Sequence, residues 1–245
     1  MSSKKILTVG LGGATCGGKS TLAQLLGSLF GKSCQKLNQD DFYFPATYTG
    51  HTFIPEFNHI NWELESAFDD AKLVKTVGDI VEKSTSTTAH STTTDVGVVS
   101  NEHIESVIQT LETGGAAKAE SLLNAQGTEL SPSCQKLFER LELAQLILVV
   151  EGIHVLSNNQ LFDLCDLKVY VTLDHHTCLN RRKLRSYDPP DPPGYFEKIV
   201  WPTYEEQHQT LSKSNLNIHF LDGRKPMCEN FSQLLQLVLR HCKAN

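Results

Sequence analysis

Short apolar runs alternate along this chain with longer segments whose apolar residues recur every three or four positions. The first run covers residues 6–9 and is followed by glycines, after which Leu22, Leu25, Leu26 and Leu29 have helical spacing. Runs of this length that are rich in branched residues are typical of buried strands. Further strands are predicted over residues 35–37, 146–150, 167–172 and 216–221, and a helical pattern follows each of them.

Two features interrupt this alternation. After a long loop that contains Trp62, the spacing predicts a helix from about Ser66, with an apolar stripe formed by Phe68, Ala71, Val74, Val77 and Val81. Residues 84–94 then read STSTTAHSTTT, which offers too little apolar surface to offset the entropy of ordering. We therefore expect a flexible Ser/Thr-rich insertion at about residues 84–100, followed by a helical appendage to about residue 144.

The alternation of strands and helices predicts an α/β fold, in which a five-stranded parallel sheet carries helices on both faces. The length of 245 residues fits one domain that covers residues 1–245. In such sheets, ligands bind beyond the carboxyl ends of the strands. The loops that follow the strands are thus expected to carry the catalytic and ligand-binding residues.

The charge balance excludes some classes of partner. Lys and Arg number 22 against 28 Asp and Glu, a net charge of −6, whereas nucleic-acid-binding proteins usually carry the opposite balance. The longest apolar run, LILVV at residues 146–150, is far too short to span a bilayer. The N-terminus has no signal-peptide pattern, and the seven cysteines contain no C-x-x-C pair. We expect a cytoplasmic, monomeric protein with reduced thiols that binds neither nucleic acid nor membrane.

The loop after the first strand has a specific phosphate-binding pattern. Residues 13–20 read GATCGGKS and match G-x-x-x-x-G-K-[ST] between a strand and a helix. In such a loop the backbone N–H groups face phosphate oxygens, Lys19 reaches the β and γ phosphates, and Ser20 can bind Mg²⁺. A plain glycine turn is the alternative. The predicted ATP-binding residues of this segment are Gly13, Ala14, Thr15, Cys16, Gly17, Gly18, Lys19, Ser20 and Thr21.

Acidic residues follow two of the other strands. Asp40 and Asp41 come after the second strand, and Asp40 is the candidate base that would accept a proton from an acceptor hydroxyl, with Lys19 as its catalytic partner. Glu151 directly follows the run at 146–150, where an acidic group helps to hold Mg²⁺. The expected magnesium set is Ser20, Asp40 and Glu151. An Asx turn at Asp40 and a surface charge at Glu151 are the structural alternatives.

A guanine-nucleotide switch is disfavoured, because the sequence has no N-K-x-D and its D-x-x-G, at residues 191–194, lies in a proline loop. The dense basic cluster NRRKLR at residues 180–185 instead suggests a small lid. Arginine forks can clamp a transferring phosphoryl group, whose charge spreads over several oxygens. A solvated helix face and a nuclear-localisation patch are the alternatives for this cluster.

Four motifs together resemble the nicotinamide riboside kinases, within the uridine kinase-like P-loop kinases. They are GATCGGKST at 13–21, QDDF at 39–42, VVEG at 149–152 and the long run RRKLRSYDPPDPPGYFEKIVWPTY at 181–204. The resemblance implies Mg²⁺-dependent transfer of the ATP γ-phosphoryl group to the 5′-hydroxyl of nicotinamide riboside, giving the mononucleotide for NAD synthesis. It also implies nicotinic acid riboside as a second substrate.

The resemblance further implies individual roles. Asp40 would be the base, Arg182 would hold the ribose hydroxyls, and Tyr187 would stack on the nicotinamide ring. Residues 61–63 read NWE, where animal members tend to have tyrosine and then aspartate, so Trp62 and Glu63 are expected to keep the stacking face and the charge. Trp62 could instead be a half-buried core residue. The remaining implied site residues are Asp41 and Phe42 on the substrate side and Arg181, Arg185, Asp222, Gly223 and Arg224 on the ATP side.

Two other functions stay open at this point. A uridine or cytidine kinase would need hydrogen bonds to the edge of its base, whereas a cationic pyridinium mainly needs aromatic faces and nearby carboxylates. A catalytically silent ATP-binding regulator would bind ATP without transferring its phosphoryl group.

Overall fold

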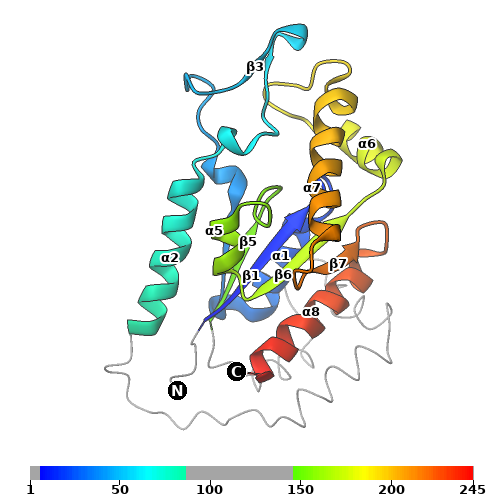
Figure 1. Ribbon diagram of the computed structural model, residues 1–245. Helices are drawn as coiled ribbons and strands as arrows, with labels where there is room; N and C mark the ends of the chain where they lie inside the picture. Colours follow the sequence, from blue (N-terminus) through cyan, green and yellow to red (C-terminus); the bar gives the residue numbers. More distant parts are fainter. Residues whose placement is uncertain (1–5, 87–145, 245) are drawn as a thin grey trace.

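The computed structural model describes residues 6–86 and 146–244, and at its centre lies one parallel sheet (Figure 1). The strand order is β2-β5-β1-β6-β7, and every neighbouring pair is parallel. The predicted five-stranded parallel sheet is therefore confirmed. Its strands are β1 (Ile6–Gly13), β2 (Cys34–Asn38), β5 (Leu146–Glu151), β6 (Leu167–Thr172) and β7 (His219–Asp222).

Helices cover both faces of the sheet, as predicted. On one face, Leu7, Val9 and Leu11 of β1 share a core with α1 (Lys19–Phe30) and α8 (Met227–Ala244). On the other face, Leu148 and Val150 of β5 share a second core with α2, α5, α6 and α7. These four helices are α2 (Asp70–Ser86), α5 (Asn159–Leu164), α6 (His175–Lys183) and α7 (Trp201–Lys213). No helix among the described residues combines the length and apolar character needed to cross a bilayer.

Two glycines in the central strand allow the second face to pack closely. A Cβ atom added at Gly10 would lie 2.6 Å from the Cys165 sulfur, and one added at Gly12 would lie 3.0 Å from the Leu156 side chain. Because side chains alternate along a strand, these glycines face the opposite side from Leu7, Val9 and Leu11. The chain after β5 can therefore sit directly against the backbone of β1.

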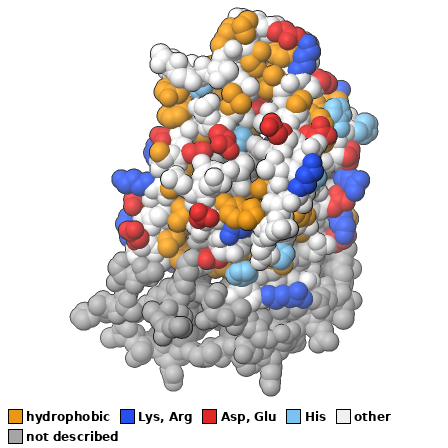
Figure 2. Space-filling model, viewed as in Figure 1, with side chains coloured by type: hydrophobic (Ala, Val, Ile, Leu, Met, Phe, Trp, Pro, Cys, Tyr) orange, Lys and Arg blue, Asp and Glu red, His pale blue; other side chains and the backbone are white. Residues whose placement is uncertain are grey.

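The segment above the carboxyl edge of the sheet contains elements that the apolar pattern did not predict. A short antiparallel hairpin joins β3 (Phe53–Ile54) to β4 (His59–Ile60) and stands at the top of the molecule (Figure 1). Hydrophobic side chains gather there on the surface (Figure 2), including Phe53, which is 53% exposed. The short helical turns are Gly31–Ser33, Gln39–Phe42, Pro55–Phe57 and Glu65–Ala67, and the π-helix Phe196–Val200 leads into α7.

Three predicted boundaries are wrong. Strand β1 continues to Gly13 instead of ending at residue 9, so the first glycine of the phosphate-binding pattern ends the strand. Helix α2 begins at Asp70 rather than near Ser66, because residues 65–67 form a separate tight turn, and Leu73 and Val77 are buried whereas Ala71 is exposed. Strand β7 begins at His219 rather than at residue 216. The predicted insertion at about 84–100 and the helical appendage to about 144 lie outside the described residues, except for residues 84–86, which end α2.

Candidate active site

A pocket of about 450 Å³ lies at the carboxyl edge of the sheet, between the glycine loop, the turn after β2, the end of β5 and the segment after α6. The predicted site residues come from six separate stretches of the chain, and the fold brings most of them to this pocket. Those that line it are Thr15, Cys16, Gly17, Gly18, Lys19, Ser20, Asp40, Trp62, Glu63, Glu151, Arg182, Arg185 and Tyr187.

The glycine loop forms one wall of the pocket. Gly13 has a φ of 120°, and a Cβ atom there would lie 2.1 Å from the Val171 carbonyl oxygen, so only glycine fits. The buried Lys19 ammonium donates to the carbonyl oxygens of Gly13, at 3.1 Å, and Ala14, at 2.8 Å. The loop therefore closes around this side chain, while the amino-terminal end of α1 with its positive potential opens to the pocket.

Two carboxylates face this ammonium. Burial lowers the pKa of Lys19, and the nearby Glu151 and Asp40 oppose that shift. Burial raises the pKa of Glu151, which shares a hydrogen bond with the Ser20 hydroxyl, and crowding by protein atoms raises the pKa of Asp40, although its side chain stays open to solvent. Two carboxylates and a hydroxyl are oxygen donors of the kind that Mg²⁺ uses together with substrate phosphates.

Cation sites built from protein ligands alone follow a different pattern. Across residues 6–86 and 146–244, no group of three or more His, Cys, Asp or Glu side chains is placed to hold a metal ion. With only two carboxylates and one hydroxyl, the set at Ser20, Asp40 and Glu151 fits a cation that phosphate oxygens and waters also hold, which is the usual case for Mg²⁺.

At the other end of the pocket, Arg182 is the centre of a buried ion-pair network. Its Nε and Nη2 donate to the two carboxylate oxygens of Asp191, at 2.6 and 3.1 Å, and Nη2 also donates to Glu63 Oε1, at 3.0 Å. Its Nη1 lies 3.4 Å from the Thr15 hydroxyl. Burial raises the pKa of Glu63, and the Arg182 charge opposes that shift. Arg182 is thus held by carboxylates from two loops.

Aromatic side chains complete this end of the pocket. The Arg182 guanidinium lies over one face of the Tyr187 ring, 4.5 Å from its centroid. The Trp62 ring lines the pocket and meets Tyr43 edge to face, with the ring centroids 5.7 Å apart. The backbone N–H of Trp62 donates to the Tyr195 hydroxyl at 3.0 Å, and the Tyr43 hydroxyl donates to the Trp62 carbonyl at 3.3 Å. Trp62 is half-buried, and its backbone is held from both sides.

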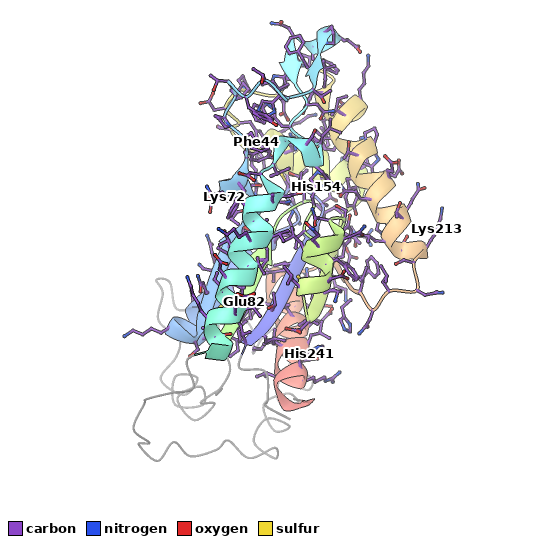
Figure 3. The ribbon with its side chains drawn as sticks, turned by 60° about the vertical axis from the view of Figure 1, so that its left-hand side comes forward. Phe44, Lys72, Glu82, His154, Lys213 and His241 are labelled. Carbon is purple, nitrogen blue, oxygen red and sulfur yellow. The ribbon has the colours of Figure 1, made fainter. Side chains whose placement is uncertain are left out.

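Some predicted residues lie outside the pocket lining. Asp41 is exposed, and Phe42 packs against the second core with the Lys72 ammonium 5.8 Å from its ring centroid. Phe44, two residues further on, does line the pocket, from the segment that crosses above α2 (Figure 3). In the glycine loop, Gly13 and Ala14 are buried and Thr21 is exposed on α1.

The predicted ATP-side residues form a separate link. Arg181 donates to the carbonyl oxygens of Cys16, at 3.3 Å, and Gly223, at 2.9 Å, and so ties the glycine loop to the loop after β7. Asp222 and Arg224 form an exposed ion pair with an N–O distance of 2.7 Å. These residues lie beside the glycine loop rather than in the 450 Å³ pocket. Arg185, by contrast, lines that pocket.

Several residues of the site had no predicted role. Asp191, Tyr195 and Tyr43 each contact a predicted site residue, and His154 and Gln39 lie beneath the pocket. Asp191 and Tyr195 belong to the run at 181–204, so their place in a distinctive motif was a usable signal. No sequence pattern marks His154, because the Glu63 and Gln207 partners of its ring are distant in the sequence.

Comparisons with known proteins agree with this geometry. The profile of the Phosphoribulokinase / Uridine kinase family matches residues 8–188. Nicotinamide riboside kinase 1 of Mus musculus is 27% identical over 232 residues, covering 95% of this chain and 93% of the mouse protein. Nicotinamide riboside kinase of Saccharomyces cerevisiae is 25% identical over 271 residues, covering 99% of this chain and 100% of the yeast protein. Uridine kinase of Chlamydia pneumoniae is 23% identical over 181 residues, covering 74% of this chain and 64% of the bacterial protein.

The profile match includes the glycine loop, the Asp40 turn, Glu151 and the arginines of α6. It therefore covers the sheet up to β6 and most of the pocket, whereas β7 lies beyond it. On this match, the chain belongs to the phosphoribulokinase/uridine kinase family.

Proposed function

We propose that this protein transfers the γ-phosphoryl group of ATP to the 5′-hydroxyl of nicotinamide riboside, giving the mononucleotide, and that it also accepts nicotinic acid riboside. One observation carries the proposal. A single pocket joins a phosphate-binding loop with two carboxylates at one end to a buried arginine–carboxylate network and aromatic rings at the other. The relatives from mouse and yeast, which are named nicotinamide riboside kinases, support the same substrate.

The phosphate end would position ATP. The backbone N–H groups of the glycine loop and Lys19 would hold the β and γ phosphates, and Arg185 lines the pocket where it could reach the transferring group. Ser20 and Glu151 would hold Mg²⁺ together with phosphate oxygens, and Asp40 completes the acidic set. When bound, the cation neutralises charge that develops on the phosphates.

Asp40 would accept the proton of the acceptor hydroxyl. Its carboxylate is open to the pocket and is close enough to Lys19 for the two charges to affect each other's pKa. A carboxylate at this place can orient the hydroxyl and take its proton as the oxygen–phosphorus bond forms. The reaction then depends mainly on positioning and on charge stabilisation.

The other end would hold the nucleoside. One carboxylate oxygen of Glu63 accepts a hydrogen bond from Arg182, so the remaining lone pairs of the carboxylate can accept hydrogen bonds from ribose hydroxyls. Arg182 covers one face of Tyr187, which leaves the opposite face of that ring for a flat substrate. A cationic pyridinium would be favoured by the aromatic faces of Tyr187 and Trp62 and by the carboxylate of Glu63.

A pyrimidine nucleoside is the second candidate, because one relative is a uridine kinase. Uracil and cytosine need hydrogen bonds to their edges. The segment that lines the pocket beside Trp62 consists of Tyr43, Phe44, Pro45 and Ala46, which is largely apolar. This lining favours a ring that is recognised by stacking.

The test is an ADP-release assay with Mg-ATP and four nucleosides in parallel: nicotinamide riboside, nicotinic acid riboside, uridine and cytidine. We expect higher kcat/KM for the two pyridine ribosides. The matched controls are Lys19→Met, which removes the buried ammonium and should abolish turnover, and Lys213→Met, which changes an exposed lysine at the end of α7. Turnover of uridine and cytidine alone would show that the substrate is a pyrimidine nucleoside. ATP binding without turnover of any nucleoside would favour a catalytically silent ATP-binding regulator.

A further inference from the structure

A buried polar network lies beneath the pocket, and its central residue is His154. This residue lies in the bend just after Glu151, which ends β5, and is 2% exposed. Figure 3 shows it inside the fold, between α2 and α7. A histidine this deeply buried needs partners for both ring nitrogens.

The partners of His154 fix which nitrogen carries the proton. Its Nε2 lies 2.8 Å from the backbone carbonyl oxygen of Glu63, and a carbonyl can only accept, so Nε2 carries the hydrogen. Its Nδ1 accepts from the side-chain nitrogen of Gln207, at 2.7 Å, and also lies 3.3 Å from the Ser157 hydroxyl and 3.7 Å from the Glu65 carboxylate. The Gln207 donor on α7, as the nearest of these groups, favours the same tautomer as the Glu63 carbonyl.

The backbone of His154 reaches a second part of the site. Its N–H donates to the side-chain oxygen of Gln39 at 2.9 Å, and Gln39 is fully buried directly before Asp40. The Gln39 side-chain nitrogen in turn donates to Asp70 at 3.1 Å. His154 therefore connects the turn that carries Asp40 with the segment that carries Glu63.

The segment that contains Trp62 and Glu63 has no helix or strand of its own. Its position depends on side chains from elsewhere: the Tyr195 and Tyr43 hydroxyls hold the Trp62 N–H and carbonyl, and His154 holds the Glu63 carbonyl. The hydrogen bond from His154 is the shortest of the three, and it acts on the residue whose side chain pairs with Arg182. Without it, the Glu63 peptide unit would be free to shift and to carry the carboxylate out of its pairing with Arg182.

We propose that His154 is a positioning residue for the nucleoside, which acts by donating from Nε2 to the Glu63 carbonyl and so fixes the Trp62–Glu63 segment at the ribose end of the pocket. The inference rests on the proposed function for the identity of that nucleoside. A role in packing alone is the competing explanation, because the Phe68 ring meets His154 edge to face with 5.5 Å between the centroids. Packing alone predicts that an apolar side chain of similar size can replace the histidine.

The decisive comparison is His154→Gln against His154→Leu. Glutamine can place an N–H donor near the position of Nε2, whereas leucine fills space without a donor. We expect His154→Leu to raise KM for nicotinamide riboside about tenfold, the usual scale for a lost buried hydrogen bond, with KM for ATP changed less than about twofold. His154→Gln should restore KM for the riboside to within about threefold of the wild type.

A second readout does not need activity. The chain has two tryptophans, so Trp201→Phe leaves Trp62 as the sole tryptophan fluorophore. In that background we expect acrylamide to quench Trp62 more strongly in His154→Leu than in His154→Gln. If wild-type protein fails to phosphorylate any riboside, the proposed function fails while this fluorescence comparison still tests the positioning role.

Two further variants keep the inference testable if His154→Leu does not fold. Gln207→Met removes the donor to Nδ1 from a half-buried site and should change KM for the riboside and Trp62 quenching in the same direction, by a smaller factor. His208→Leu is the matched control on α7, because that ring stacks on Tyr204 and Tyr170 instead. Equal effects of His154→Leu and His154→Gln in folded protein, no effect of either, or an equal rise of both KM values would overturn the inference.

Discussion

The Asp191 carboxylate accepts two hydrogen bonds from the guanidinium of Arg182, with N–O distances of 2.6 and 3.1 Å. The two residues are nine positions apart in the chain. This forked pairing joins the proline loop to the last turn of α6. It also leaves only Nη1 of Arg182 facing the glycine loop, near Thr15. The arginine predicted to hold the ribose is thus oriented by a carboxylate that had no predicted role.

Replacing Asp191 by asparagine should weaken that orientation. An amide offers one acceptor where the carboxylate offers two, and it removes a charge from a largely buried network. For Asp191→Asn we expect the free energy of unfolding to fall by about 1–3 kcal/mol and KM for the riboside to rise several-fold. Urea unfolding and initial rates measure the two effects. Glu197→Gln, an exposed change in the same segment, should leave both unchanged.

The adjacent carboxylates Asp40 and Asp41 should differ sharply. Both side chains are exposed, but Asp40 lines the pocket and Asp41 does not. We expect Asp40→Ala to lower kcat by about 10²–10⁴, the usual contribution of a positioned base, with little change in ATP affinity. Asp41→Ala should retain nearly full turnover. Comparable losses in the two variants would show that the turn as a whole, and not the Asp40 carboxylate, supports the reaction.

Tyr187 tests the stacking face. Burial raises its pKa to about 12, so its hydroxyl stays protonated at neutral pH, and that hydroxyl lies 3.6 Å from the Cys16 sulfur. Tyr187→Ala should raise KM for the riboside about tenfold and leave KM for ATP nearly constant, because stacking is worth about 1–2 kcal/mol. Tyr187→Phe keeps the ring and should have a much smaller effect. A rise in both KM values would indicate a general defect of the lid.

The pH dependence of stability should carry a contribution from His154. Burial lowers its pKa below the ordinary value of 6.5, against the opposing effects of the Glu63 carbonyl, Glu65 and Asp70. Below pH 6.5 the unfolded chain then binds a proton that the folded protein does not, so stability falls as pH falls, by up to about 1.4 kcal/mol per pH unit.

His154→Gln removes this contribution. Its free energy of unfolding should therefore decline less steeply than that of the wild type between about pH 7 and pH 5. Carboxyl groups with a raised pKa, such as Glu63 and Glu151, act in the opposite direction, but they are common to both proteins and cancel in the difference. Parallel curves for the two proteins would mean that His154 gains its proton equally well when folded.

The sequence predicted those parts of the fold that local pattern determines. The strands stand out because both faces of the parallel sheet are covered, which makes each strand a nearly continuous apolar run. The glycine loop is one contiguous motif whose residues act together. The β3–β4 hairpin could not be predicted in this way, because each of its strands has two residues and shows no period. The start of α2 was missed because Ser66 lies in a tight turn that continues the helical spacing.

The site was predictable where residues act through their own chemistry and unpredictable where they act through distant partners. Lys19 and Asp40 follow strands and Glu151 ends one, so topology alone brings them together. His154 meets Glu63 across a sequence separation of 91 residues, and Gln207 meets His154 across 53. Such contacts depend on how loops pack after the sheet has formed, and no local pattern encodes them.

The order of strands in the sheet also has a consequence for biosynthesis. Strand β1 is made first, yet both of its neighbours, β5 and β6, come from the second half of the chain, with Ile6 beside Leu146 and Val9 beside Leu167. A nascent chain must therefore keep an apolar amino-terminal segment unpaired until those strands have left the ribosome. We expect the central strand to be the part of this protein that most needs protection from aggregation during translation.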